Sequence, residues 1–258
     1  GEECKMKDYL LKAVACHEHV RVYICSSTNL VEEARQRFDL WPTASATLGR
    51  TLSVGSMMGS MLKSDKEQLT IRINGGGPIG TVLVDAYSDG HVRGFVSNPH
   101  VHYQYNDTGK LAVGIAVGKE GTLEVIKDLG MKENWSGTVE LQSGEIGDDF
   151  AYYFTVSEQT PSAVSVGVLV DTDCTVKCAG GWLVQLMPGV KDADIDRLEA
   201  NLAKLEPMTA MLDKGMSLEE IISAVLDGFE VDFLQTEEIG YRCACSREKV
   251  ERALISLG

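Results

Sequence analysis

The sequence has few basic residues for its number of acids and has no long, uncharged apolar run. Its 258 residues include 24 Lys and Arg against 38 Asp and Glu, a formal net charge of −14. Such a surface repels nucleic acid phosphates and acidic membranes, which argues against both as partners. The longest weakly charged run, Trp41 to Leu62, contains Arg50 and three glycines, which favours a buried helix over a membrane span.

The sequence also lacks the basic and then apolar start of a secretory signal peptide, because its first residues read Gly-Glu-Glu-Cys-Lys. Its cysteines are odd in number, which does not suit a complete set of disulfides: Cys4, Cys16, Cys25, Cys174, Cys178, Cys243 and Cys245. We therefore expect a reducing, cytoplasmic setting in which the thiols are free, bound to metal or redox-active.

Common catalytic motifs are missing as well, including G-x-S-x-G and H-E-x-x-H. The glycine loop Gly75–Gly77 lacks the Lys-Ser/Thr of a phosphate-binding loop and precedes another strand, which favours a tight turn. His17 with His19, and His100 with His102, could each share one strand face and ligate a metal. No partner ligand is evident near them, which favours surface or turn histidines. An α+β enzyme that uses this loop or a histidine cluster remains the alternative hypothesis.

Alternating apolar residues and glycine turns dominate the first 187 residues. This two-residue period predicts strands at Tyr9–Cys16, Val20–Ser26, Leu69–Ile73, Thr81–Ala86, His91–Val96, Leu111–Val117, Thr122–Lys127, Thr138–Gln142, Val164–Val170 and Val176–Leu186. The segment Ile146–Glu158 fits either a helix or a strand, and Asp148 and Asp149 suit a helix N-terminus.

Two helices are expected within this strand-rich part. The first spans Asn29 to Phe38, with Asn29 and Glu32 as a candidate N-cap pair. The second follows Trp41-Pro42 and ends near Leu62. It contains Gly55 and Gly59, four residues apart, a spacing that permits close packing of another backbone in a core.

After Met187-Pro188 the apolar period changes to that of a helix. Apolar residues three or four apart predict an amphipathic helix kinked near Pro207: Ile195, Leu198, Leu202, Leu205, Met208 and Leu212. Ser217 and Glu220 match a capping box at the start of another helix. We predict that the stripe Leu198, Leu202, Leu205 and Leu212 lies against the strand-rich core, because each buried leucine gives about 1.5–3 kcal/mol.

These patterns predict an α+β protein with a strand-rich core domain and packed helices at 1–187. A helical linker region follows at 188–234, and residues 235–258 form the start of a cysteine-containing domain. Cys243-Ala-Cys245 is the sharpest local feature, since two close thiolates can chelate a soft metal or be oxidised together. Two unrelated thiols are the alternative reading. Cys174 and Cys178 are interpreted as buried or half-exposed thiols rather than ligands.

Several segments in a fixed order resemble the heat shock protein 33 family along nearly the whole chain. They are Asn74-Gly-Gly-Gly-Pro-Ile-Gly80, Leu83-Val-Asp85, His91-Val-Arg-Gly-Phe-Val-Ser-Asn-Pro99, Gly144-Glu-Ile-Gly-Asp-Asp-Phe-Ala-Tyr-Tyr-Phe154, Ser157-Glu-Gln-Thr-Pro161, Gly180-Gly-Trp-Leu-Val-Gln-Leu-Met-Pro188 and Cys243-Ala-Cys245. The resemblance implies an ATP-independent, redox-regulated holdase chaperone that binds unfolding proteins under oxidative stress. It also implies a homodimer that can swap its linker regions, and Leu198, Leu202, Leu205 and Leu212 are candidate client-binding residues.

In the family, a C-x-C pair and a later C-x-x-C pair bind zinc in the reduced state and form disulfides on oxidation. By resemblance, Cys243 and Cys245 are the first two zinc ligands and one future disulfide. The sequence ends at Gly258 before any C-x-x-C pair. We therefore expect zinc in the full-length reduced form, and metal-free or oxidised thiols in a chain truncated at this point. A helix expected over Ser246–Leu257 would need to dock on other parts of the protein.

Overall fold

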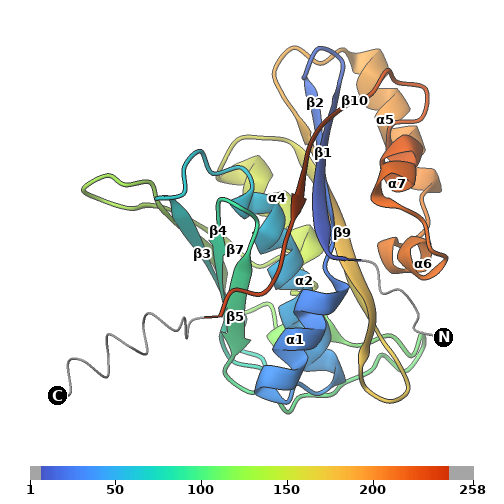
Figure 1. Ribbon diagram of the computed structural model, residues 1–258. Helices are drawn as coiled ribbons and strands as arrows, with labels where there is room; N and C mark the ends of the chain where they lie inside the picture. The colour runs from blue at the N-terminus through green and yellow to red at the C-terminus, as the bar shows by residue number, and fades with distance from the viewer. Residues whose placement is uncertain (1–6, 244–258) are drawn as a thin grey trace.

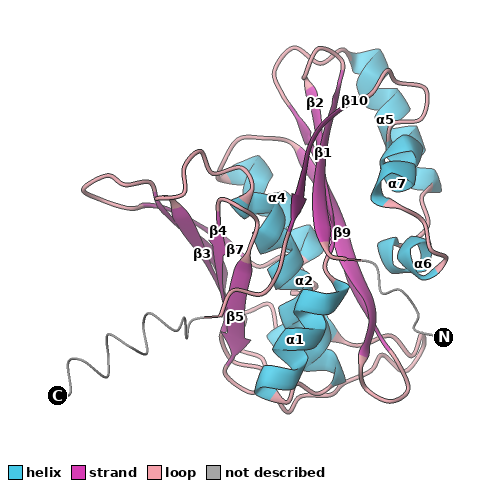
Figure 2. Ribbon diagram, in the orientation of Figure 1, coloured by secondary structure: helices cyan, strands magenta, loops and turns pink. Residues whose placement is uncertain are grey.

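The computed structural model describes residues 7–243 and has an α+β architecture of stacked layers (Figure 1). Figure 2 shows two separate groups of strands with helices between them and further helices outside one of them. The expected α+β class is therefore confirmed. Cys245 and the helix expected over Ser246–Leu257 lie outside the described residues.

The first sheet has the strand order β10-β1-β2-β9-β8, with every neighbouring pair antiparallel. Its strands are β1 (Tyr9–Ala15), β2 (Val20–Ser26), β8 (Ser162–Val170), β9 (Val176–Leu186) and β10 (Asp232–Glu238). Almost every residue of β2 and β9 is buried, because helices cover both faces of this sheet.

The second sheet has the order β5-β4-β3-β6-β7 and is also antiparallel. Its strands are β3 (Gln68–Asn74), β4 (Val82–Tyr87), β5 (Val92–Val96), β6 (Thr122–Asp128) and β7 (Trp135–Glu140). Burial alternates along β3 and β4, so only one face of this sheet meets the core. The period of two predicted β3, β4, β5 and β6 to within one residue at each end, whereas β7 begins three residues before the predicted Thr138–Gln142.

The helix α2 (Pro42–Gly59) lies between the two sheets and is buried along almost its whole length. Some of its buried hydroxyls donate to carbonyls one turn earlier, as Thr47 does to Thr43 (2.8 Å), and others donate outside the helix, as Ser56 does to Gly90 (2.6 Å). A Cβ at Gly59 would lie 2.4 Å from the Tyr87 carbonyl oxygen, and one at Gly55 would lie 2.9 Å from Val84. The predicted close packing at these glycines is confirmed.

The helix α1 (Thr28–Phe38) packs beside α2, but its expected cap is wrong. The Asp8 carboxylate, from the segment before β1, accepts from the backbone amides of Asn29 (3.1 Å) and Leu30 (2.7 Å). Glu32 instead accepts from the amide of Val176 (3.0 Å). A carboxylate that arrives from outside the helix satisfies the free amides, so no local capping pair is needed.

The strand expected at Leu111–Val117 is wrong, because Val113–Val117 forms the short helix α3. Two carbonyls at its end, on Val117 and Ala116, accept from the amides of Gly77 (2.9 Å) and Ile79 (3.0 Å). The glycine loop therefore packs on α3, where a Cβ at Gly75 would lie 2.3 Å from the Gly118 carbonyl oxygen. A short apolar run has no periodicity that separates helix from strand, and this tertiary contact decides it.

The ambiguous segment after residue 145 forms the helix α4 (Gly147–Val156), which packs on β8. Asp148 and Asp149 lie in its first turn, as predicted. Asp149 is fully buried and its carboxylate accepts from four backbone amides, those of Gln142, Ser143, Gly144 and Ile146. These bonds hold the loop between β7 and α4 against the core.

Three helices cover the outer face of the first sheet, seen on the right of Figure 1. They are α5 (Asp192–Lys204), α6 (Met208–Asp213) and α7 (Leu218–Val225). The single kinked helix expected around Pro207 is two helices, because Leu205 and Pro207 have extended backbone angles between them. Ser217 caps α7 by accepting from the Glu220 amide (3.1 Å), as predicted.

The strand β10 returns from these helices to pair with β1 in the first sheet. It contains residue 234, where the sequence placed the end of the linker region. The division into units at 1–187, 188–234 and 235–258 stays a prediction.

Candidate functional site

The first sheet carries one apolar cluster on each face. On the outer face, β1, β2 and β9 pack against α5–α7. We call this the linker interface and define it by its buried residues: Leu11, Ala13, Ala15, Val20, Val22, Ile24, Cys178, Trp182, Val184, Leu198, Met208, Met211, Leu212, Leu218, Ile221, Ile222, Val225 and Leu226.

The predicted leucine stripe points into the linker interface. Leu198 and Leu212 are buried, with 3% and 8% of their surface exposed, and Leu202 and Leu205 are half-buried against the same cluster. The expectation that this stripe packs on the core is confirmed. Its role in binding other proteins stays a prediction.

Two glycines of the sheet leave the space that α6 fills. A Cβ at Gly167 in β8 would lie 2.8 Å from the Thr209 methyl group, and one at Gly180 in β9 would lie 2.8 Å from Leu212 Cδ1. The Gly180-Gly181 pair inside an apolar strand is the sequence signal for such a close approach. This signal indicates that another element approaches the sheet at these glycines, but it does not show that the element is α6.

Few polar contacts join the linker helices to the sheet. The Tyr9 hydroxyl donates to Glu219 Oε2 (2.9 Å) and accepts from the Leu218 amide (3.1 Å). Burial, followed by the nearby Glu219, raises the pKa of Tyr9 to about 12. The Cys178 thiol donates to the Thr209 carbonyl (3.4 Å), and burial raises the pKa of this thiol to about 11. The interface thus depends mainly on apolar contact.

Cys16 also lies at this interface, in the turn between β1 and β2. Burial and the neighbouring Asp194 of α5 raise the pKa of its thiol. Both Cys174 and Cys178 were expected to be buried or half-exposed. Cys178 is buried, whereas Cys174 is exposed in the turn between β8 and β9. The sequence does not place Cys16 and Cys178 at this interface, because it does not show which helices pack on which strands.

The segment after β10 runs along both sheets before it reaches Cys243. Ile239 is buried in the core, and Tyr241 forms a bridge to Val92 at the edge of the second sheet. The Tyr241 hydroxyl donates to the Gly94 carbonyl (3.1 Å), and the Arg242 guanidinium lies 3.8 Å from the centre of the Tyr87 ring. We call residues 239–243 the strap.

Cys243 ends the strap and is exposed. It lies beside Arg37 at the end of α1, where the guanidinium donates hydrogen bonds to Glu33 and to Cys243; these two bonds, Glu33 first, raise the pKa of the guanidinium. A neighbouring cation stabilises a thiolate. Within residues 7–243, no group of three or more His, Cys, Asp or Glu side chains could hold a metal ion.

The predicted histidine pairs do not converge. His17 lies in the turn between β1 and β2, while the His100 ring stacks on Trp41 (5.1 Å) and its Nε2 lies 3.0 Å from Asp39. Of the four, only His102 lines a hollow among those found in the described part of the chain.

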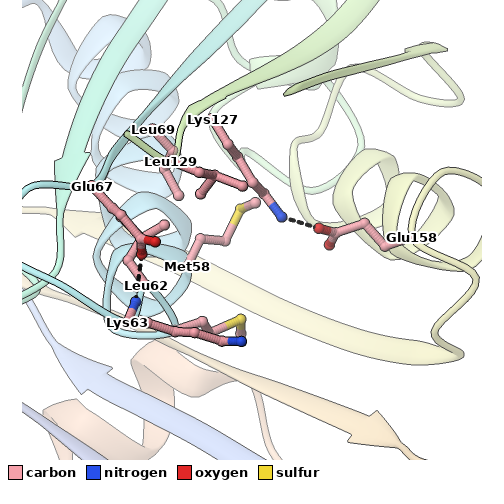
Figure 3. Close-up of a pocket in the computed structure, with 9 residues that line it drawn as sticks. Met58, Leu62, Lys63, Glu67, Leu69, Lys127, Leu129 and Glu158 are labelled. Atoms are coloured by element: carbon pink, nitrogen blue, oxygen red, sulfur yellow. Dashed lines mark hydrogen bonds and ion pairs between the residues drawn. The ribbon is translucent and has the colours of Figure 1, made fainter. Parts of the chain in front are cut away.

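A small hollow of about 210 Å³ opens at the end of α2 (Figure 3). Its floor is apolar, with Met58, Leu62 and Leu129, and a Lys127–Glu158 ion pair lies at its edge. Because the lysine and the carboxylate neutralise each other, neither is placed for acid–base chemistry on a ligand.

Among the helices of residues 7–243, none combines the length and the apolar character needed to cross a bilayer.

The family model described as Hsp33 protein matches residues 8–258. The chain is 51% identical to the 33 kDa chaperonin of Geobacillus kaustophilus, over 98% of this chain and 86% of that protein. It is also 51% identical to the 33 kDa chaperonin of Bacillus cereus strain G9842, over 98% and 87%. The crystal structure of the 33 kDa chaperonin (heat shock protein 33 homolog) from Thermotoga maritima aligns with a TM-score of 0.87 at 37% identity, over 98% and 86%.

These matches cover nearly all of the chain, and the arrangement of sheets and helices agrees with the family expected from the sequence motifs. They give no support to the enzyme alternative. The chain belongs to the Hsp33 family of redox-regulated chaperones, which are not enzymes.

Proposed function

We propose that the linker interface is the gate of an ATP-independent holdase. With α5–α7 docked, the outer face of the first sheet and the leucine stripe cover each other. Release of the helices exposes both surfaces, which then bind apolar segments of unfolding proteins. The observation that carries this proposal is the linker interface itself, a large apolar contact with few polar ties.

The energy balance of this contact suits a gate. Each large apolar side chain that is buried, such as Ile221 or Leu198, contributes about 1.5–3 kcal/mol. Ordering the linker backbone costs about 1–2 kcal/mol per residue. Because the two contributions are large and opposed, a modest loss of support elsewhere is enough to release the helices.

The strap is the route by which a cysteine switch acts on this gate. Hsp33 proteins bind zinc in the reduced form, and Cys243 with Cys245 supplies half of such a site in this proposal. The described residues alone do not make a metal site, and the proposal places the remaining ligands outside them. A two-electron oxidant such as a peroxide would take up the electron pair released as Cys243 and Cys245 form an S–S bond, and the two sulfurs could then no longer hold zinc. This loss would withdraw support from the strap and from β10.

The proposal includes a homodimer in the cytoplasm. The linker helices connect to the sheet through a short segment near Pro188 and through β10, whose one partner strand within residues 7–243 is β1. Short connections of this kind allow the helices to dock on a second copy instead of on their own sheet. Sedimentation velocity on the reduced full-length protein measures the oligomeric state directly. A monomer at all protein concentrations contradicts this part of the proposal.

The first experiment is an aggregation assay with a thermally unfolding client, run without ATP on the full-length protein. We expect suppression of aggregation by the oxidised protein and little by the reduced protein. Equal activity in both redox states would show that the cysteines do not operate the gate. Absence of activity in both states would contradict the holdase function.

The second experiment opens the gate without oxidation. Gly167→Val places a side chain where Thr209 packs, and the branched residue suits a strand. We expect the reduced variant to suppress aggregation. The matched control is Gly167→Val combined with Thr209→Gly, which restores the space and should restore the inactive reduced state. A reduced Gly167→Val protein that is folded but inactive contradicts gating at this interface.

A further inference from the structure

The two sheets have four outer edges, and three of them are short, charged or covered. The edge strand β10 contains Asp232, Glu237 and Glu238, and β7 ends at Glu140. The edge strand β5 is bonded through Val92 to residues 240 and 242 of the strap. Charges and covering segments of this kind keep sheet edges from pairing with other chains.

The edge strand β8 (Ser162–Val170) has none of these protections. Its nine residues, Ser-Ala-Val-Ser-Val-Gly-Val-Leu-Val, contain neither a charge nor a proline. Nearly all of them are only half-buried. Within residues 7–243, the backbone hydrogen bonds of this strand run to β9 alone. A long, apolar and unpaired edge is the feature that sheet proteins otherwise avoid.

The hydrogen bonds at both ends of β8 show which of its backbone groups are unpaired. The Leu186 amide donates to the Pro161 carbonyl (3.0 Å), and the Asp171 amide donates to the Thr175 carbonyl (2.8 Å). Alternate residues of an antiparallel strand face the same neighbour. Both ends therefore give one pattern: Ser165, Gly167 and Leu169 bond to β9, while Val166 and Val168 direct N–H and C=O groups away from the sheet.

A groove of about 870 Å³ runs beside this edge. It is lined by residues 165–172, by residues 207–210 of the linker, and by residues of the loop around 102–111 together with Arg50. Arg50, His102 and Lys110 lie among its lining residues together with the acids Asp171 and Asp213. These charges largely balance, although the chain as a whole carries −14.

We propose that the β8 edge is a strand-addition site for an extended, uncharged segment of an unfolding protein. Unpaired backbone groups in register can be satisfied by any extended chain, whatever its sequence. The balanced charge of the groove suits an uncharged segment rather than a strongly basic or acidic one. This inference rests on the holdase function proposed above and assigns it a second contact, beside the linker interface.

A single extended strand is the occupant that this edge favours. Val166 and Val168 supply outward N–H and C=O groups, and an extended chain of any sequence can pair with them. The charges among the lining residues nearly cancel, so no electrostatic attraction selects a strongly charged partner.

Amide hydrogen exchange at single residues tests this assignment. The probe is a peptide of about eight alternating valines and threonines with a terminal lysine at each end, added to the oxidised full-length protein. We expect the amides of Val166 and Val168 to exchange about tenfold more slowly with peptide, a shift typical of a newly formed hydrogen bond. The amides of Ser165 and Gly167, already bonded to β9, should not change.

A pair of variants separates the backbone from the side chain. Val166→Pro removes the outward N–H of residue 166, a loss that an edge strand tolerates. Val166→Ala also removes the valine side chain but keeps this N–H. We expect Val166→Pro to lose peptide binding and Val166→Ala to retain it. The peptide with N-methyl groups at every second residue should not bind the unchanged protein.

Other outcomes overturn the assignment. Unchanged or evenly slowed exchange at all of residues 165–168, in a protein that still suppresses aggregation, removes the β8 site and leaves the holdase function intact. Slow exchange of Val166 and Val168 without peptide, dependent on protein concentration, assigns the edge to a second copy instead. Loss of aggregation suppression in both redox states contradicts the holdase function, whereas the peptide exchange pattern still decides whether β8 adds a strand.

Discussion

On one face of the first sheet, Leu52 of α2 and Phe150 of α4 are completely buried. On the other face, Leu202 and Leu205 of the linker are only half-buried. The inner face is closed by a second sheet as well as by helices, whereas within residues 7–243 no further sheet or helix lies on the outer side of α5–α7 (Figure 1). Apolar residues alternate in the same way toward both faces, so composition does not separate a permanent core from a removable cover. The difference lies in how many layers support each contact.

The largest expected effect compares one leucine from each face. Leu52→Ala should lower the free energy of unfolding by about 2–5 kcal/mol, because the surroundings of a fully buried leucine cannot collapse into the cavity. Leu212→Ala should cost less and should raise chaperone activity in the reduced state. Urea unfolding and the aggregation assay measure the two effects. Equal losses of stability without activation would show that both faces unfold as one unit.

The pH dependence of stability should come from the inner side through Asp8. Burial, only partly offset by hydrogen bonds from Asn29 and Leu30, raises the pKa of Asp8 from 3.8 to about 6. The folded state therefore holds this proton more tightly than the unfolded state. The resulting stability is complete below pH 3.8 and is lost as the pH rises through 6, by about 3 kcal/mol.

Asp8→Asn should remove that loss, because the amide stays uncharged. Chemical denaturation of the unchanged protein and the variant between pH 4 and pH 7 gives the difference. Release of the linker is monitored by the reaction of the Cys178 thiol with a thiol reagent. We expect the extent of this reaction to change much less over this pH range. A parallel change in both would mean that Asp8 also supports the linker.

A smaller effect is expected at the Tyr9 hydroxyl, one of the polar contacts of the linker interface. Tyr9→Phe removes the bond to Glu219 and the acceptor for the Leu218 amide, which should weaken docking by about 1 kcal/mol. The variant should become active at a lower oxidant concentration than the unchanged protein. Tyr23→Phe, a hydroxyl lost on the inner face, is the control and should not move that midpoint.

The smallest effect is expected in the strap. Arg242→Ala removes the cation above the Tyr87 ring, an interaction worth about 0.5–1 kcal/mol at an exposed site. It should slightly lower the oxidant concentration needed for activation, and Arg242→Lys should restore part of the difference. An unchanged midpoint would mean that the strap does not transmit the state of the cysteines.

Much of the fold could be predicted from local pattern. Strands β3 and β4 alternate cleanly because one face of their sheet meets water, and Ser217 caps α7 through a contact within one turn. The errors lie where a distant segment decides. The run Val113–Val117 is helical because the glycine loop bonds to its last carbonyls, and α1 is capped by Asp8 from another part of the chain.

The features of the candidate site likewise divide into those that a local pattern predicts and those that depend on distant segments. The spacing of Leu198 and Leu212 predicted an amphipathic helix, and Gly180 inside an apolar strand indicated a close approach. Neither pattern shows that Leu212 fills the space at Gly180, because the two residues belong to different elements. The same limit hides Cys16 and Cys178 at the linker interface and the unpaired edge of β8.

The sequence by itself determined the class of fold, the family motifs and the acidic, thiol-rich character of the chain, because these depend on composition and on spacing within single elements. Only the tertiary structure decided which apolar face is covered twice and which once, which sheet edge stays unpaired, and where the strap carries Cys243. These features depend on which distant elements meet. Burial and hydrogen bonding between such elements are properties of the packed chain, and no local period encodes them.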